Sequence, residues 1–270
     1  MRGDPRHDGA TGRAASRHAL ALARPPTRRD IAFYRTCRFI AVAASRLVFP
    51  GRVLGREHLP LEGAYVLAPV HRSYVDWLLV ARVTKRRLRY IVKQEVWKSR
   101  LVGRLLEALG AFPVNRSGAD REALERSRAV LESGEPLVMF PEGTRRSGPA
   151  VKDLREGTAY LALRTGVPVV PVGIGGSEQA MPRGSKLPRP RRVDIVIGPV
   201  VMPPAAQGER PPRTSARAEK AMPGDEVVLS PEGSPRGVRV SRRAMSEFSD
   251  QVGRAIQDAF DAARRSVGMR

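Results

Sequence analysis

The sequence predicts an α/β protein: a mixed sheet flanked by helices, preceded by an amphipathic helix. Short apolar runs that are typical of buried strands alternate along the chain with longer segments of helical periodicity. Polar loops that contain arginine follow several of these runs directly. The chain has 270 residues, of which 41% are hydrophobic, and this is enough to bury a sizeable core.

The amino-terminal part of the chain divides into two segments. Residues 1–29 carry seven arginines and only short apolar patches, and we expect a disordered basic arm. Residues 30–50 are predicted to form an amphipathic helix, in which Arg35, Arg38 and Arg46 fall within an arc of about 80° beside a wide apolar face. Such a helix could pack on the core or lie on an anionic bilayer, and the charge of the whole chain favours the bilayer.

The core domain is expected over residues 51–202. The predicted strands are residues 64–70, 88–92, 111–116, 136–140, 167–174 and 192–198. The predicted helices are residues 74–84 with Ser73 as the N-cap, 119–134 ending at Gly134, and 154–166 ending at Gly166. Between the second and third strands, Trp97, Leu101, Leu105 and Leu109 form an amphipathic segment.

The carboxyl-terminal part changes character twice. Residues 203–240 are rich in proline, glycine and charge, which is typical of a disordered insertion, although a hairpin is an alternative. Residues 241–270 are predicted to form a helix that packs on the core, because apolar residues recur there at spacings of three or four. These residues are Met245, Phe248, Val252, Ile256 and Phe260.

Charge narrows the classes of function. The formal net charge is +21, with 48 basic and 27 acidic residues, which implies an anionic partner: nucleic acid, an anionic membrane surface or a phosphate-bearing substrate. Aromatic residues make up only 5%, and no helix-turn-helix, zinc-finger or RNA-binding pattern occurs. We therefore expect no specific nucleic-acid partner, and nucleic-acid binding stays as the alternative of a different class.

Cysteine and hydropathy exclude further classes. The single cysteine, Cys37, excludes disulfide frameworks, cysteine-rich zinc sites and iron–sulfur clusters, and we expect no metal. No run of 18 apolar residues predicts a spanning helix. The expected location is the cytoplasmic face of the cell membrane, as a peripheral or monotopic protein.

The motif "HRSYVD" supplies a candidate catalytic pair, His71 and Asp76. A neutral imidazole is a suitable base near pH 7, and an aspartate bonded to its other ring nitrogen would fix the tautomer. A loop after the strand 64–70 would bring the two side chains together. Taken alone, this spacing also fits a surface histidine beside a capping aspartate.

Two further strand-end loops favour the catalytic interpretation. The run "FPEGTRRSG" places Gly143 where the backbone could approach a ligand, and Arg145 where it could grip a phosphate. "GAFPVNR" places Arg116 in the same way. Ligands of open α/β sheets gather at the carboxyl ends of strands. Each arginine alone could be a solvated residue, but several such loops together indicate an anion site.

Four motifs in order give the chain a resemblance to the glycerolipid acyltransferases, in particular to 1-acylglycerol-3-phosphate acyltransferases. The motifs are "HRSYVD", "GAFPVNR", "FPEGTRRS" and "VPVVPVGI". With "VLGREHLP" and "YIVKQEVW", the resemblance covers residues 31–200. It departs at Val70, where many relatives have asparagine, and "HRSYVDWLL" also resembles enzymes that acylate glycerol-3-phosphate. Glycerol-3-phosphate or another lysolipid therefore stays open as the acceptor.

The resemblance implies a reaction and a set of roles. His71, oriented by Asp76, would deprotonate the acceptor hydroxyl as it attacks the thioester of acyl-CoA or acyl carrier protein, giving phosphatidic acid in phospholipid biosynthesis. The thioester is a co-substrate, and no cofactor is expected. Lys93 would add a phosphate contact and Pro171 would shape the pocket. The residues implied to bind the acceptor are Arg116, Glu142, Gly143, Thr144 and Arg145.

Overall fold

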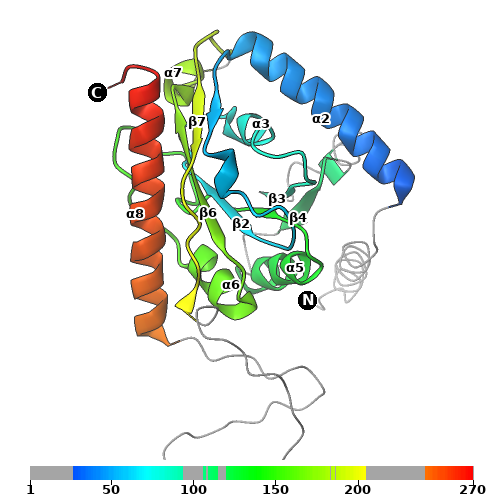
Figure 1. Cartoon of the computed structure of the whole chain (residues 1–270), viewed down its shortest axis with the longest axis vertical. Coiled ribbons are helices and arrows are strands. Elements are labelled where there is room, and N and C mark those ends of the chain that lie inside the picture. The colour runs from blue at the N-terminus through cyan, green and yellow to red at the C-terminus, as the bar shows by residue number, and fades with distance from the viewer. Residues whose placement is uncertain are drawn as a thin grey trace, which may run out of the picture.

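The computed structural model describes most of the predicted core. The described residues are 27–93, 106–107, 109–114, 120–182, 184–185, 187–204 and 241–269. Nearly all of the predicted basic arm, most of the segment from Trp97 to Leu109 and most of the predicted insertion at 203–240 lie outside them, so the predicted domain boundaries stay predictions. Within the described residues the molecule is one seven-stranded sheet with helices packed around it (Figure 1), which confirms the predicted α/β fold.

The sheet is mixed and its middle is buried. Its strand order is β1-β7-β6-β2-β5-β3-β4, and every pair is parallel except β6 with β7. The strands are β1 (Val53–Leu54), β2 (Val66–Pro69), β3 (Arg89–Lys93), β4 (Ala111–Val114), β5 (Leu137–Val138), β6 (Val169–Gly175) and β7 (Asp194–Ile197). Strands covered on both faces form continuous apolar runs in the sequence, which is why the strands were predicted except β1, a two-residue strand at the edge of the sheet. Because β2, β5 and β3 are parallel neighbours, the loops that follow them meet at one edge.

The helices follow the prediction with one correction. They are α2 (Arg28–Val48), α3 (Asp76–Val80), α5 (Asp120–Glu132), α6 (Gly157–Thr165), α7 (Ser177–Ala180) and α8 (Arg242–Ser266), with a 3₁₀ turn at Arg56–His58. The helix predicted from residue 74 begins only at Asp76, and its N-cap is Val75. Ser73 is not the cap, because its hydroxyl donates to Met181 O (2.9 Å) and its own N–H donates to the Asp76 carboxylate.

Helix α8 lies against strands β6 and β7 at very close range (Figure 1). A Cβ atom on Gly173 would lie 2.1 Å from Ala259 O, and one on Gly175 would lie 2.1 Å from Ala263 O. Only glycine allows two backbones to approach this closely. The buried side chains Phe248, Val252, Ile256 and Phe260 share the spacing that predicted this helix.

Helix α2 has one packed face and one open face. A capping box at Thr27 and Asp30 starts it, and Tyr34, Val42 and Ser45 are buried against the domain. Its opposite face exposes large apolar side chains: Phe33 (52%), Phe39 (72%), Ile40 (61%) and Leu47 (85%). The helix therefore packs on the core and also presents an uncovered apolar surface, and its binding to a bilayer stays a prediction.

Candidate active site

The loop between β2 and α3 brings His71 and Asp76 together. His71 follows the end of β2, and its Nδ1 lies 2.9 Å from Asp76 Oδ2. The Asp76 side chain is fully buried, whereas 20% of the His71 side chain is exposed. The Phe140 ring lies against the imidazole, with ring centroids 4.2 Å apart. The imidazole is therefore held from two sides, while part of it reaches the surface.

Asp76 organises the whole loop. The same Oδ2 atom accepts hydrogen bonds from Arg72 N (2.7 Å) and Ser73 N (2.7 Å) in addition to its contact with His71. The chain thus wraps around one carboxylate oxygen. With Nδ1 directed at Asp76, Nε2 is the ring nitrogen left to face a substrate, which suits a general base.

A buried ion pair joins this loop to the loop after β5. Arg72 Nη1 lies 2.7 Å from Glu142 Oε1 and 2.6 Å from Oε2, and both residues are almost fully buried. Glu142 Oε2 also accepts from His71 N (2.9 Å). The rest of the guanidinium donates to Gly148 O (3.2 Å) and Ala150 O (3.0 Å). One arginine and one glutamate therefore fix the catalytic loop on its neighbour.

This geometry corrects the role expected for Glu142. The residue was predicted to help bind the glycerol-phosphate part of the acceptor, but both carboxylate oxygens are already bonded to Arg72. A buried anion would also repel a phosphate. Glu142 is a structural partner of the catalytic loop, and sequence reasoning missed Arg72 because the sequence does not show that this particular arginine is buried.

Gly143 and Thr144 form the turn that follows Glu142. Gly143 has φ +64°, a backbone conformation that favours glycine, and a Cβ atom there would displace the side chain of Arg155. Thr144 is exposed. The two positions therefore shape the loop that carries Arg145.

Two adjacent arginines in this loop have different surroundings. Arg145 stacks on the ring of Tyr74, with its Cζ 3.2 Å from the ring centroid. Arg146 N donates to His71 O (2.9 Å), and the Arg146 side chain pairs with Asp153 (3.1 Å). Sequence reasoning did not assign Tyr74 a role, although it lies inside the first motif.

Three predicted site residues remain: Pro171, Lys93 and Arg116. Pro171 lies inside β6, opposite Ala68, and accepts from Gly198 N (2.9 Å), so it is a buried strand residue that does not reach these loops. His71 is three residues beyond Ala68, or roughly 10 Å along an extended strand. Lys93 ends β3, where it pairs with Val114. Arg116 lies outside the described residues.

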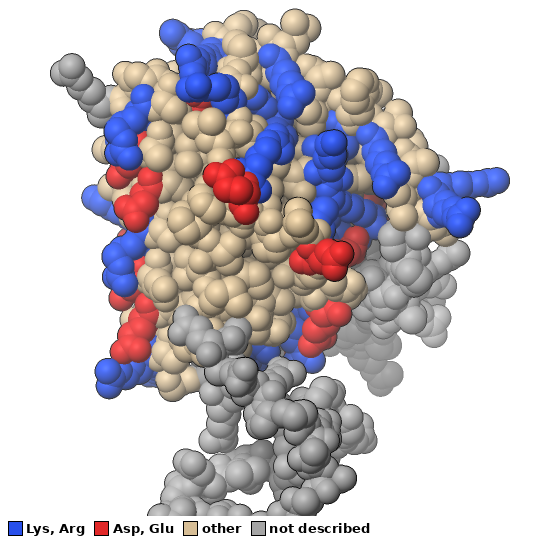
Figure 2. Space-filling model, in the orientation of Figure 1, with Lys and Arg blue, Asp and Glu red and all other residues tan. Residues whose placement is uncertain are grey.

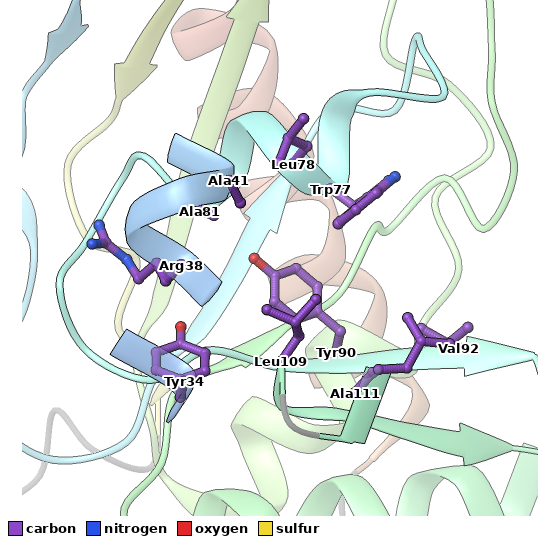
Figure 3. A pocket seen from close by; sticks show the side chains of 11 residues that line it. Tyr34, Arg38, Ala41, Trp77, Leu78, Ala81, Tyr90, Val92, Leu109 and Ala111 are labelled. Atoms are coloured by element: carbon purple, nitrogen blue, oxygen red, sulfur yellow. The ribbon is translucent and has the colours of Figure 1, made fainter. Parts of the chain in front are cut away.

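A cavity of about 340 Å³ opens beside α3, on the side of α2 (Figure 3). Trp77 and Leu78, which directly follow Asp76, form part of its wall. Burial raises the pKa of Tyr34 and raises that of Tyr90 well above the ordinary value, so both phenols stay neutral. The lining of the cavity is mostly apolar and consists of Tyr34, Arg38, Ala41, Trp77, Leu78, Ala81, Tyr90, Val92, Leu106, Leu109 and Ala111.

A histidine held by a buried aspartate at the edge of an α/β sheet is a site for general-base catalysis. In the described part of the chain, no group of three or more His, Cys, Asp or Glu residues is placed to hold a metal ion. The site thus offers a base, a nearby arginine loop and an apolar cavity.

Comparison with known proteins agrees with this class. An acyltransferase family model matches residues 51–175. The chain is 27% identical over 148 residues to the 1-acyl-sn-glycerol-3-phosphate acyltransferase of Bacillus subtilis (strain 168), covering 54% of this chain and 71% of that one. It is 28% identical over 169 residues to a protein of the same description from Chlamydomonas reinhardtii, covering 60% of this chain and 50% of the relative.

The fold agrees as well. The crystal structure of the 1-acyl-sn-glycerophosphate (LPA) acyltransferase from Thermotoga maritima has a TM-score of 0.60 to this chain at 20% identity, covering 95% of this chain and 87% of that one. Residues 51–175 thus match the acyltransferase model, and the likeness to the solved structure concerns the fold.

The pair His71–Asp76 gives a first prediction. His71→Ala should lower kcat by about 100- to 10,000-fold, the usual effect of losing a general base, with a melting temperature within a few degrees of the unmodified protein. Asp76→Asn should also be severely impaired. Thioester consumption and thermal melts measure the two effects. His58→Ala, which removes a histidine bonded to Ile197 O at another edge, is the control that should keep its activity. Near-normal turnover of His71→Ala would rule out the base.

The buried ion pair gives a second prediction. Glu142→Ala should cost about 3–5 kcal/mol in the free energy of unfolding, because it leaves the Arg72 guanidinium buried without its partner. The matched control is Asp153→Asn, which breaks the exposed pair with Arg146 and should cost only about 0–1 kcal/mol. Denaturant unfolding measures both. A loss below about 1 kcal/mol for Glu142→Ala would show that the pair does not hold the loops together.

Proposed function

We propose that the protein is an acyltransferase that moves a fatty acyl group from acyl-CoA or acyl carrier protein to the free hydroxyl of 1-acylglycerol-3-phosphate. The product, phosphatidic acid, would enter phospholipid biosynthesis. The observation that carries the proposal is the His71–Asp76 pair, 2.9 Å apart, beside the loop of Arg145. The names of the curated relatives in Bacillus subtilis and Chlamydomonas reinhardtii support the choice of acceptor.

The proposed reaction is a direct transfer. His71 Nε2 takes the proton of the acceptor hydroxyl as its oxygen bonds to the thioester carbonyl carbon. The tetrahedral intermediate then collapses, the C–S bond breaks, and the leaving thiolate receives the proton from the imidazolium. Asp76 keeps the proton on Nδ1 and stabilises the imidazolium. An acyl-enzyme is not required, and neither Cys37 in α2 nor Ser73, bonded to Met181 O, is placed as its nucleophile.

The acceptor has two parts that need recognition. Arg145 supplies a cation for the phosphate, since a guanidinium can grip a phosphate with two hydrogen bonds. The acyl chain already on the acceptor needs an apolar path away from the base. The cavity beside Trp77 supports such a path, because its walls are mostly apolar and include Trp77, the residue that follows Asp76 in the chain. Glycerol-3-phosphate, the alternative acceptor, would use the phosphate contact but not the cavity.

The proposed location is the cytoplasmic surface of the cell membrane. Among the described residues, the helices lack the combination of length and apolarity that a membrane crossing requires. The open face of α2 exposes Phe39, Ile40 and Leu47, and Trp77 nearby is 49% exposed. Figure 2 shows basic side chains along the edge formed by α2, whereas basic and acidic side chains alternate along α8. An apolar face beside positive charge suits binding to an anionic bilayer.

Acceptor choice is the test of the proposed reaction. With acyl-CoA, the purified protein should acylate 1-acylglycerol-3-phosphate at least about tenfold faster than glycerol-3-phosphate, a difference of about 1.4 kcal/mol in transition-state binding. Arg145→Ala should lose most of this activity, and a lysolipid without phosphate should be a poor acceptor. A clear preference for glycerol-3-phosphate would favour the alternative, and equal use of phosphate-free lysolipids would contradict the role of Arg145.

Vesicle binding tests the location. The protein should sediment with anionic vesicles and much less with neutral ones, and salt should weaken binding only in part, because buried apolar area is not screened. Replacing Phe39 and Leu47 by Asn should reduce sedimentation sharply. Leu61→Asn is the control, since Leu61 is 90% exposed but lies outside α2. Equal sedimentation of the α2 variant and the control would show that α2 is not the membrane-binding element.

A further inference from the structure

Tyr74 has an unusual position for an exposed aromatic residue. It lies within the catalytic loop, three residues after His71 and two before Asp76, and 44% of it is exposed. The Arg145 guanidinium from the loop after β5 stacks over its ring at 3.2 Å. The stack therefore links the loop of the base to the loop of the arginine proposed to bind phosphate.

Stacking restrains an arginine without using its hydrogen-bond donors. A guanidinium contacts an aromatic ring through its face, while its N–H groups point outward in its own plane. A cation–π contact contributes ~0.5–1 kcal/mol at exposed sites and ~2 kcal/mol or more when desolvated. An arginine whose guanidinium is already held in one orientation loses less side-chain freedom when an anion binds, and such preorganisation raises the affinity for the anion.

The same stack has a fixed relation to the base. Tyr74 belongs to the loop that Asp76 holds through Arg72 N and Ser73 N. On the other side, Arg146 N donates to His71 O, so the residue after Arg145 is bonded to the catalytic residue itself. One backbone contact and one stacked contact therefore link the loop of Arg145 to the loop of His71.

We propose that Tyr74 is a positioning residue that holds Arg145 in the orientation for the phosphate of the acceptor. The inference rests on the proposed function and deepens it: Tyr74 determines affinity for a phosphomonoester-bearing glycerolipid, and it takes no part in proton transfer. Its ring face acts, and its hydroxyl does not.

Steady-state kinetics with 1-acylglycerol-3-phosphate and acyl-CoA test the proposal. Tyr74→Leu keeps an apolar side chain but removes the ring, and should raise KM for the acceptor about tenfold with kcat within about threefold. Tyr74→Phe keeps the ring face and should restore KM to within about twofold of the unmodified enzyme. Thermal melts of both variants should stay close to that of the unmodified protein, because the ring is half exposed.

The double variant separates the failure of this inference from the failure of the proposed function. If Tyr74 acts through Arg145, Tyr74→Leu should add little to the effect of Arg145→Ala. An unchanged KM in Tyr74→Leu, alongside a raised KM in Arg145→Ala, would overturn the role of Tyr74 and leave the phosphate site standing. An unchanged KM in both would contradict the phosphate site itself. Loss in Tyr74→Phe equal to that in Tyr74→Leu would show that the hydroxyl acts, which also overturns the proposal.

Discussion

The buried pair of Arg72 and Glu142 is the interaction on which the site depends. Removing two charges from water is expensive, and the expense is offset only where the geometry is good and the remaining donors are bonded. Here both carboxylate oxygens contact one guanidinium nitrogen, and the other guanidinium nitrogens reach Gly148 O and Ala150 O. Because Glu142 also accepts from His71 N, the backbone of the base is fixed by the same pair.

The two carboxylates of the site have separate tasks. Asp76 orients the imidazole through Nδ1, and Glu142 fixes the loop that carries it. Neither is placed as a contact for an anionic substrate, so recognition of a phosphate would depend on arginine. The cavity beside Trp77, the residue after Asp76, is mostly apolar, which suits a substrate with a charged head and an aliphatic chain.

Sequence reasoning predicted the sheet, most helices and the contact of His71 with Asp76, because apolar runs and short loops express local constraints. It predicted Ser73 as the N-cap of α3, since serine is a frequent N-cap. In the structure, the Asp76 carboxylate instead accepts the N–H groups of Arg72 and Ser73. It assigned Glu142 to the binding of the acceptor, because neither the burial of Glu142 nor its partner 70 positions away leaves a local pattern in the sequence. The role of Pro171 stays a prediction, because a motif resemblance does not say how far a strand residue lies from the strand's end.

The protonation of the His71 ring tests the central claim most directly. If Asp76 holds the ring for general-base catalysis, Nδ1 carries the proton and Nε2 is unprotonated when the imidazole is neutral. Nitrogen-15 NMR of the histidine rings, with His71 assigned by comparison with His71→Ala, reports this tautomer. The account predicts the Nδ1–H form in the unmodified protein and its loss in Asp76→Asn. A neutral His71 that carries its proton on Nε2 in the unmodified protein would contradict the account, because that nitrogen could not accept the proton of the acceptor hydroxyl.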